Sequence, residues 1–155
     1  MAACTVLERE LGIRDRTFLI FCGGGNNGGD GFVAARKILS AGGTPEVFIL
    51  GDPGKYLGAA RTNFDILNKL PVAAARLDSP AKASDALSRC DAVIDALLGT
   101  GIDREVTGLY AETIRMINES GKPVLSLDIP SGVNGDTGRE MGDAIEADYT
   151  VTFGL

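Results

Sequence analysis

Residues 21–31 read Phe-Cys-Gly-Gly-Gly-Asn-Asn-Gly-Gly-Asp-Gly, and this stretch decides the fold. An apolar run at residues 17–22 comes before it, and a helical pattern at residues 32–39 follows it. The run predicts a strand buried on both faces. Glycine and asparagine tolerate positive φ, so we expect a turn between this strand and the helix. Backbone N–H groups at such a helix start can hold an anionic or polar ligand, so the stretch predicts the floor of a nucleotide-type binding site.

Outward from this stretch, short apolar runs alternate with helical patterns along the whole chain. Further strands are expected at residues 45–50, 72–77, 91–96, 123–127 and 147–153, and further helices at residues 4–11, 56–70, 80–90 and 109–118. Strands that alternate with helices indicate right-handed βαβ units. We therefore predict an α/β fold in one domain over residues 1–155. It is a three-layer αβα sandwich, with a Rossmann-like, mostly parallel sheet covered by helices on both faces.

Composition excludes several classes of function. The formal charge is −6 with no run of Lys or Arg, which argues against a nucleic-acid surface. The chain has no signal peptide and no apolar stretch of the ~20 residues that a membrane helix needs, so we expect no membrane partner. The three cysteines are an odd number in apolar surroundings. They favour small buried hydrophobic side chains in a reducing cytoplasm over a disulfide framework.

The absence of histidine constrains the chemistry. Histidine is the usual general base near neutral pH and the commonest ligand of transition metals. Any acid–base step must therefore fall to Asp, Glu, Lys, Tyr or Cys. Any bound metal should be a hard ion held by oxygen atoms.

Three loops rich in glycine and polar residues leave the carboxyl ends of expected strands, at residues 23–30, 97–105 and 128–138. Ligands of open parallel sheets bind beyond these ends, near the point where the strand order reverses. We therefore expect the three loops to meet and to form the site.

The first loop alone suggests a dinucleotide dehydrogenase. Residues 23–28 match G-x-G-x-x-G, and Asp52 follows the next expected strand, as such an enzyme requires. Against this, residues 26–27 place two amides where small or apolar side chains are usual, and the carboxylate of Asp30 would repel a pyrophosphate. Asp30 is either a helix cap or a hydrogen-bond partner of a ribose hydroxyl.

The other two loops add flexible backbone and candidate reactive groups. Gly99 and Gly101 let the backbone approach a ligand and Thr100 supplies a hydroxyl, whereas Arg104 and Glu105 are either site residues or solvated charges. Asp128 ends an apolar strand, where a partly desolvated carboxyl can act as acid or base; the alternative is a turn former before a proline.

One side chain from each loop could join in binding a cation. Asn27, Asp95 and Ser131 could together coordinate a hard monovalent or divalent ion through oxygen.

Taken together, three motifs resemble one family. They are Gly-Gly-Gly-Asn-Asn-Gly-Gly-Asp-Gly with the following Ala-Ala-Arg at residues 23–36, Asp-Ala-Leu-Leu-Gly-Thr-Gly at residues 95–101, and Asp-Ile-Pro-Ser-Gly-Val-Asn-Gly-Asp-Thr-Gly at residues 128–138. The chain is similar to the NAD(P)H-hydrate epimerases, also called the YjeF N-terminal domain. Three ordered motifs are far more specific than one glycine loop.

The resemblance implies an isomerase of cofactor repair, which interconverts the R and S epimers of hydrated NADH or NADPH so that a partner dehydratase can restore the cofactor. It implies a potassium ion on Asn27, Asp95 and Ser131, and it makes Asp128 the candidate acid–base residue. By position, the residues that hold the hydrated nucleotide would be Asn26, Asn27, Gly28, Gly29, Asp30, Gly99, Thr100, Gly101, Ile102, Asp103, Arg104, Glu105, Tyr110 and Asp128.

The resemblance leaves alternatives. Family members begin with a longer helical region and continue past residue 155, so we expect a chain clipped at both ends and a possible homodimer. Domains of scaffold proteins share the fold without needing the activity, which leaves a nucleotide-binding module without turnover as the second interpretation. An oxidoreductase is the third. The three intact loops favour the enzyme.

Overall fold

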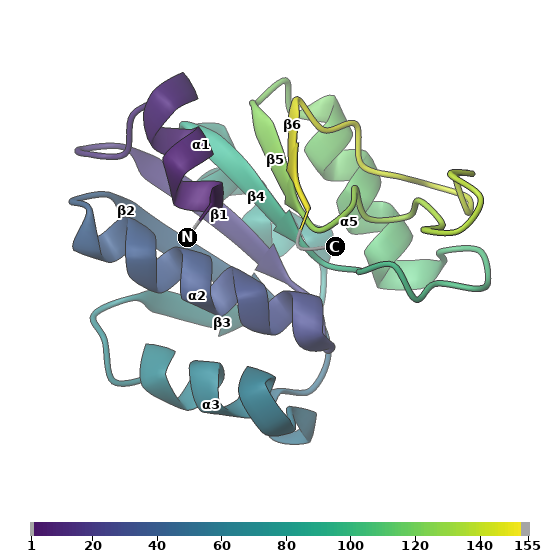
Figure 1. The fold of residues 1–155 in the computed structure, drawn as a ribbon, viewed down its shortest axis with the longest axis horizontal. Helices are drawn as coiled ribbons and strands as arrows, with labels where there is room; N and C mark the ends of the chain where they lie inside the picture. Colours follow the sequence, from purple (N-terminus) through teal and green to yellow (C-terminus); the bar gives the residue numbers. More distant parts are fainter. Residues whose placement is uncertain (1, 153–155) are drawn as a thin grey trace.

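The computed structural model describes residues 2–152, and a six-stranded sheet forms its centre (Figure 1). Each neighbouring pair of strands is parallel, and the strand order is β3-β2-β1-β4-β5-β6. The strands are β1 (Thr17–Cys22), β2 (Thr44–Ile49), β3 (Ala73–Arg76), β4 (Ala92–Ala96), β5 (Val124–Leu127) and β6 (Tyr149–Val151). The order reverses between β1 and β4, so the ligand crevice is expected there.

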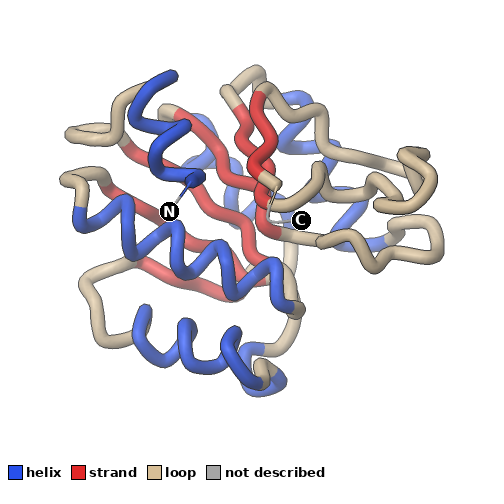
Figure 2. Tube along the Cα trace, in the orientation of Figure 1, coloured by secondary structure: helices blue, strands red, loops and turns tan. Residues whose placement is uncertain are grey.

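Helices cover both faces of this sheet (Figures 1 and 2). One face carries α1 (Ala2–Glu10), α2 (Asn26–Ser40) and α3 (Gly58–Leu67); the other carries α4 (Ser84–Arg89) and α5 (Gly108–Glu119), with short 3₁₀ turns η1 (Pro53–Lys55) and η2 (Pro80–Ala83) in the connections. Side chains of a strand alternate between faces. Phe18, Ile20 and Cys22 of β1 accordingly enter the core under α2, while Leu19 and Phe21 enter the core under α5. The predicted αβα sandwich is confirmed.

The glycine-rich stretch differs from its prediction, because α2 begins at Asn26 and not at residue 32. Much of the expected loop at residues 23–30 is therefore helix. Its glycines do not adopt positive φ; they serve close packing. A Cβ on Gly28 would lie 2.1 Å from the Gly23 carbonyl oxygen, and one on Gly31 would lie 2.5 Å from Cys22 Sγ. The absence of side chains lets the helix start lie directly on the sheet.

Other expected elements change in extent, including the helices expected at residues 4–11 and 56–70, which are observed as α1 and α3. The helix expected at residues 80–90 is split into η2 and α4. The last strand, expected at residues 147–153, is observed as β6, and Phe153 lies outside the described residues.

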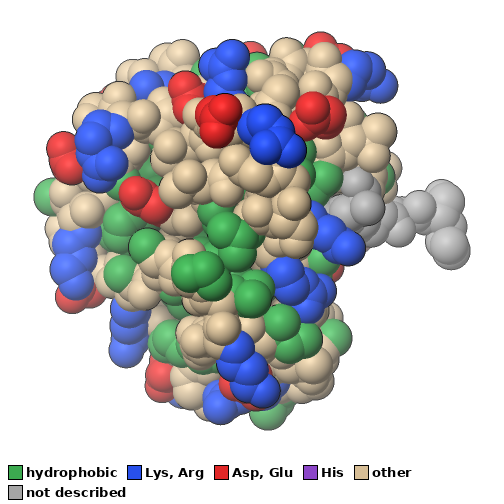
Figure 3. All heavy atoms as spheres, turned by 90° about the vertical axis from the view of Figure 1, so that its left-hand side faces the viewer, with side chains coloured by type: hydrophobic (Ala, Val, Ile, Leu, Met, Phe, Trp, Pro, Cys, Tyr) green, Lys and Arg blue, Asp and Glu red, His purple; other side chains and the backbone are tan. Residues whose placement is uncertain are grey.

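On the surface at the amino-terminal ends of the strands, acidic and basic side chains surround an area of apolar side chains (Figure 3). This face has no basic stripe of the kind that binds nucleic acid. Among residues 2–152, no helix is both long and apolar enough to cross a membrane.

Candidate functional site

A cavity of about 670 Å³ lies at the carboxyl ends of β1, β4 and β5, where the strand order reverses. Its volume lies within the range of small-molecule sites, roughly 300–1,000 Å³. The lining residues are Gly24, Gly25, Asn26, Asn27, Asp30, Leu97, Leu98, Gly99, Thr100, Gly101, Ile102, Tyr110 and Asp128. A separate hollow of about 550 Å³ between α4 and α5 contains none of the expected site residues.

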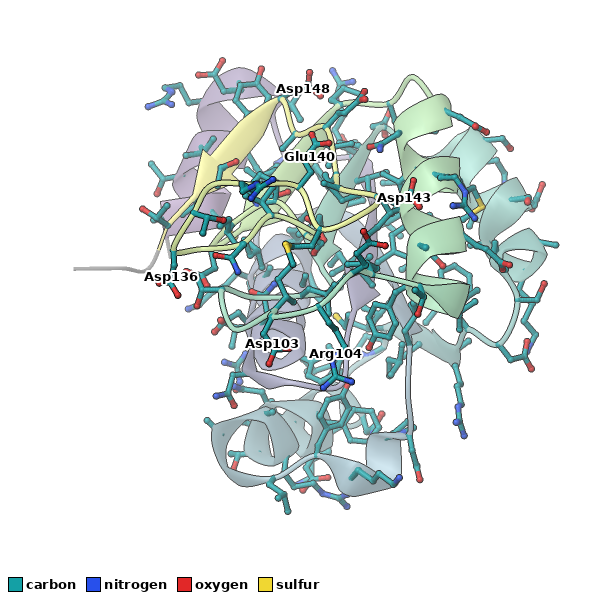
Figure 4. All side chains as sticks on the ribbon, turned by 90° about the vertical axis from the view of Figure 1, so that its right-hand side faces the viewer. Asp103, Arg104, Asp136, Glu140, Asp143 and Asp148 are labelled. Carbon is teal, nitrogen blue, oxygen red and sulfur yellow. The ribbon has the colours of Figure 1, made fainter. Side chains whose placement is uncertain are left out.

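Most of the expected substrate residues line the main cavity, but five of them lie elsewhere. Asp103, Arg104 and Glu105 line an adjoining hollow of about 340 Å³ at the outer end of the β4–α5 loop, where Figure 4 shows the first two. Gly28 and Gly29 are buried in α2 and face the Gly23 backbone and Ala60.

The start of α2 is held by two tyrosine hydroxyls. The Tyr56 hydroxyl donates to the Gly23 carbonyl oxygen at 2.7 Å, and the Tyr110 hydroxyl accepts from the Gly24 N–H at 3.3 Å. Burial raises the pKa of both phenols, so both hydroxyls stay protonated. Tyr56 was not among the residues expected from the sequence, because nothing in its local pattern indicates a partner 33 residues away.

Asp30 does not cap α2, which excludes one of the two roles considered for it. The N-cap of α2 is Gly25, with no side-chain cap, and Asp30 lies beyond the first turn. Asp30 is half-buried and lines the cavity. Desolvation raises the pKa of its carboxyl, and the negative charge of Asp128 raises it further.

Asp95 is fully buried at the end of β4 and joins the loops that follow β4 and β5. It accepts hydrogen bonds from the Ser131 hydroxyl (2.5 Å), the Ser126 hydroxyl (2.7 Å), the Ser131 N–H (2.9 Å) and the Leu97 N–H (3.2 Å). Burial raises the pKa of Asp95, and these hydrogen bonds oppose the rise. Ser126 was missed from the sequence, although a serine inside an apolar strand is a signal of a buried polar partner.

Asn27 carries an unsatisfied buried atom. Its side-chain amide donates to the Leu98 carbonyl oxygen at 3.0 Å, but Oδ1 has no hydrogen-bond partner, and the residue is only 7% exposed. A buried acceptor without a partner costs about 1–3 kcal/mol, and its usual explanation is a function or a ligand.

The three residues expected to bind a cation are linked around Leu98. Its carbonyl oxygen accepts from Asn27, its N–H donates to the Ser131 hydroxyl at 2.9 Å, and Ser131 bonds Asp95. The atoms that would bind a cation here are side-chain oxygens, and only Asp95 supplies a carboxylate. Such a set of ligands suits a hard ion. In the part of the chain that the structure describes, no group of three or more acidic or cysteine side chains could hold a metal.

Asp128 has an unusual backbone conformation. Its φ of 73° lies in the left-handed region, which costs a residue with a side chain roughly 1–2 kcal/mol. The Asp128 N–H donates to the Val151 carbonyl oxygen at 2.6 Å. Asp128 Oδ2 lies 3.6 Å from where a Cβ on Gly99 would stand, and Asn27 Cβ lies 3.8 Å from the same point. The carboxylate is thus held beside Gly99, near the start of α2.

The third loop supports the second. The side-chain amide of Asn134 donates to the Ile102 carbonyl oxygen at 2.9 Å, and its Oδ1 accepts the N–H groups of Asp136 and Thr137. Figure 4 shows Asp136 and Glu140 on the segment between β5 and β6. The structure therefore brings the three loops together. Within the third loop, Asp128 lines the cavity, and Asn134 supports the second loop.

The chain is similar to several known proteins. A family model described as YjeF-related protein N-terminus matches residues 1–155. The chain is 39% identical over 153 residues to the NAD(P)H-hydrate epimerase of Cenarchaeum symbiosum, which covers 98% of this chain and 70% of that protein. It is 47% identical over 138 residues to the bifunctional NAD(P)H-hydrate repair enzyme Nnr of Thermofilum pendens, which covers 88% of this chain. The chain spans only 26% of that bifunctional relative.

Among solved structures, the yeast protein ynu0, YNL200c, superposes with a TM-score of 0.84 at 21% identity. The match covers 96% of this chain and 65% of the yeast chain. At this identity the likeness supports the fold alone.

Proposed function

This chain belongs to the family of YjeF-related protein N-termini, and on that premise we propose that its cavity binds hydrated NADH or NADPH and interconverts the R and S epimers of the hydrated ring. The observation that carries the proposal is the Asp128 carboxylate, which a strained backbone holds in a nucleotide-sized cavity of a chain without histidine. The names of the epimerases at 34–41% identity support the choice of substrate.

Epimers have the same oxidation state, so the reaction needs no hydride acceptor. It needs a group that exchanges a proton with the hydroxyl on the hydrated carbon, and Asp128 performs this role. Gly99 and Gly101 admit the ring close to the backbone, because no side chain intervenes there. Asn26, Asn27, Asp30, Thr100, Ile102 and Tyr110 hold the rest of the nucleotide, with Asp103, Arg104 and Glu105 at its outer end.

A potassium ion is the cation that we propose for Asn27, Asp95 and Ser131. The unpartnered Asn27 Oδ1 supports it, because a bound cation would satisfy that atom. A donor set with one carboxylate suits a single positive charge. When bound, the ion would supply a positive charge to a site that contains the carboxyls of Asp30 and Asp128.

The setting that we propose is cofactor repair in a reducing cytoplasm. The three free cysteines fit that compartment. Relatives named bifunctional NAD(P)H-hydrate repair enzymes support a functional link to a dehydratase that consumes one epimer.

The test is equilibration of separated epimers. The chain is added to one epimer of hydrated NADH or NADPH in potassium buffer, and both epimers are quantified by chromatography. We expect faster equilibration without consumption of NAD and without a redox change. Binding of the hydrate with no acceleration would favour the nucleotide-binding module and contradict the enzyme. Asp128→Asn is the matched variant, because Asn also tolerates positive φ.

A further inference from the structure

Inversion at a hydrated enamine carbon sets a geometric requirement. Water adds to an enamine at the carbon bonded to nitrogen, and the nitrogen lone pair can expel it again. Loss of water from one face requires a proton donor on that face. Its return from the other face requires a proton acceptor there. If the proposed function holds, one carboxyl beside Gly99 supplies only one of these two groups.

We propose that Asp30 is the second acid–base residue of the epimerisation and acts on the face of the ring opposite Asp128. The two carboxyls come from different parts of the sheet: Asp30 lies on α2, which follows β1, whereas Asp128 follows β5. Both line the same cavity, and both are half-buried. Desolvation raises the pKa of the Asp30 carboxyl, and the negative charge of Asp128 raises it further.

Asp30 has no structural task that would explain it. It lies beyond the first turn of α2 and does not cap the helix. Within residues 2–152, no hydrogen bond or ion pair holds its side chain. Asn27, one turn earlier on the same helix, lines the same cavity.

The other ionisable groups around the cavity are less suited to the step. Tyr110 is engaged by the Gly24 N–H and the Leu50 carbonyl oxygen, and burial raises the pKa of its phenol. Asp103, Arg104 and Glu105 are exposed in the adjoining hollow. Asp95 is fully buried and does not line the cavity. Asp30 and Asp128 are therefore the two carboxyls placed to reach a bound ring.

The step balances with one proton shared by the two carboxyls. The protonated carboxyl gives its proton to the hydroxyl, the C–O bond breaks, water leaves, and the nitrogen lone pair forms a C=N⁺ bond. A water molecule then attacks the opposite face, its proton passes to the ionised carboxylate, and the C=N π electrons return to nitrogen. The product is the other epimer. The proton has moved from one carboxyl to the other, and exchange with solvent resets the pair.

The test compares isosteric variants of the full chain. Asp30→Asn and Asp128→Asn are measured against the parent and against Asp136→Asn, an exposed carboxylate in the third loop. General acid–base catalysis contributes roughly 10²–10⁴-fold. We expect kcat for equilibration to fall at least about 100-fold in each site variant, with KM within about threefold of the parent. Asp136→Asn should match the parent, and Asp30→Glu should recover part of the lost rate.

The outcomes separate this inference from the proposed function. Parent activity that survives in Asp30→Asn, or a rise in KM with kcat unchanged, would overturn the role of Asp30 and leave the epimerase intact. No equilibration by the parent would overturn both. Near-ultraviolet circular dichroism and thermal melting establish that each variant is folded. In parent reactions run in ¹⁸O-labelled water, the label should enter the hydroxyl of the new epimer; unlabelled product would contradict the route through water.

Discussion

The two walls of the cavity are built by different physical means. The α2 wall, residues 23–31, is packed so closely that a Cβ on Gly23 would lie 1.9 Å from the Leu97 carbonyl oxygen. The loop wall, residues 95–101 with residues 126–131, is held instead by the hydrogen bonds around the buried Asp95. The first wall depends on the absence of side chains, and the second depends on particular polar ones.

This difference predicts how each wall responds to change. Close packing depends on volume, so the stability of the α2 wall should be sensitive to any added side chain at its buried glycines. A network around a buried carboxylate should be sensitive to the loss of one hydroxyl and to a bound cation. Three measurements can break or sharpen the contrast.

The largest effect is expected from Gly28→Ala. The new methyl would lie 2.1 Å from the Gly23 carbonyl oxygen, which the Tyr56 hydroxyl also holds in place. Overpacking against fixed backbone should lower the free energy of unfolding by about 3 kcal/mol, despite the better helix propensity of alanine. Urea denaturation measures this free energy of unfolding. Gly24→Ala is the control, because a Cβ there meets nothing within 4 Å; equal losses in both variants would show that the packing argument is wrong.

A middle effect is expected from Ser126→Ala on the loop wall. It removes the 2.7 Å hydrogen bond to the Asp95 carboxylate, and a hydrogen bond to a charged group contributes about 1.5–3 kcal/mol. We expect a loss of about 2 kcal/mol in unfolding free energy. The increase in Tm that potassium chloride gives over lithium chloride should also shrink.

The matched control for this variant is Ser88→Ala. Its hydroxyl donates to the Asp85 carbonyl oxygen at an exposed site, so its loss should change stability by no more than about 0.5 kcal/mol. An unchanged Ser126→Ala would mean that the network around Asp95 does not hold the loop wall.

The smallest effect concerns Asp30, the carboxyl of the α2 wall. Its pKa is raised from the ordinary 3.8 by desolvation and by Asp128. The unfolded chain ionises first, so the parent loses stability as the pH rises from 3.8 through the raised pKa, and Asp30→Asn does not. By Tm, the variant should match the parent near pH 4 and be more stable at pH 7. Solvent screening limits the gain to about 0.5 kcal/mol. A gain that is larger at pH 4 would contradict the sign.

The sheet was predictable from the sequence because its strands are continuous apolar runs. The run at residues 17–22 coincides with β1, and the ends of the other strands shift by two residues at most. The meeting of the three loops followed from one rule about parallel sheets. These are properties of residue type and order, which a sequence contains directly.

The start of α2 was not predictable for a physical reason. Glycine lowers helix propensity, so residues 26–31 resemble a loop until the neighbours that exclude a Cβ are known. Tyr56 was missed for the same reason, since its partner lies across the fold. The unpartnered oxygen of Asn27 depends on atoms that no local pattern contains. Tertiary packing decided all three.

The pairing of β1 with β4 also sets the order in which the site can be assembled during synthesis. Phe18 pairs with Ala92, and the Thr17 N–H donates to an Asp91 side chain 74 residues later. At roughly 5–20 residues per second, a ribosome needs about 4–15 s to bridge that gap. During this interval β1 can pair with β2 while its opposite apolar edge is unpaired. An unpaired strand edge can aggregate, and chaperones that bind extended apolar segments would protect it.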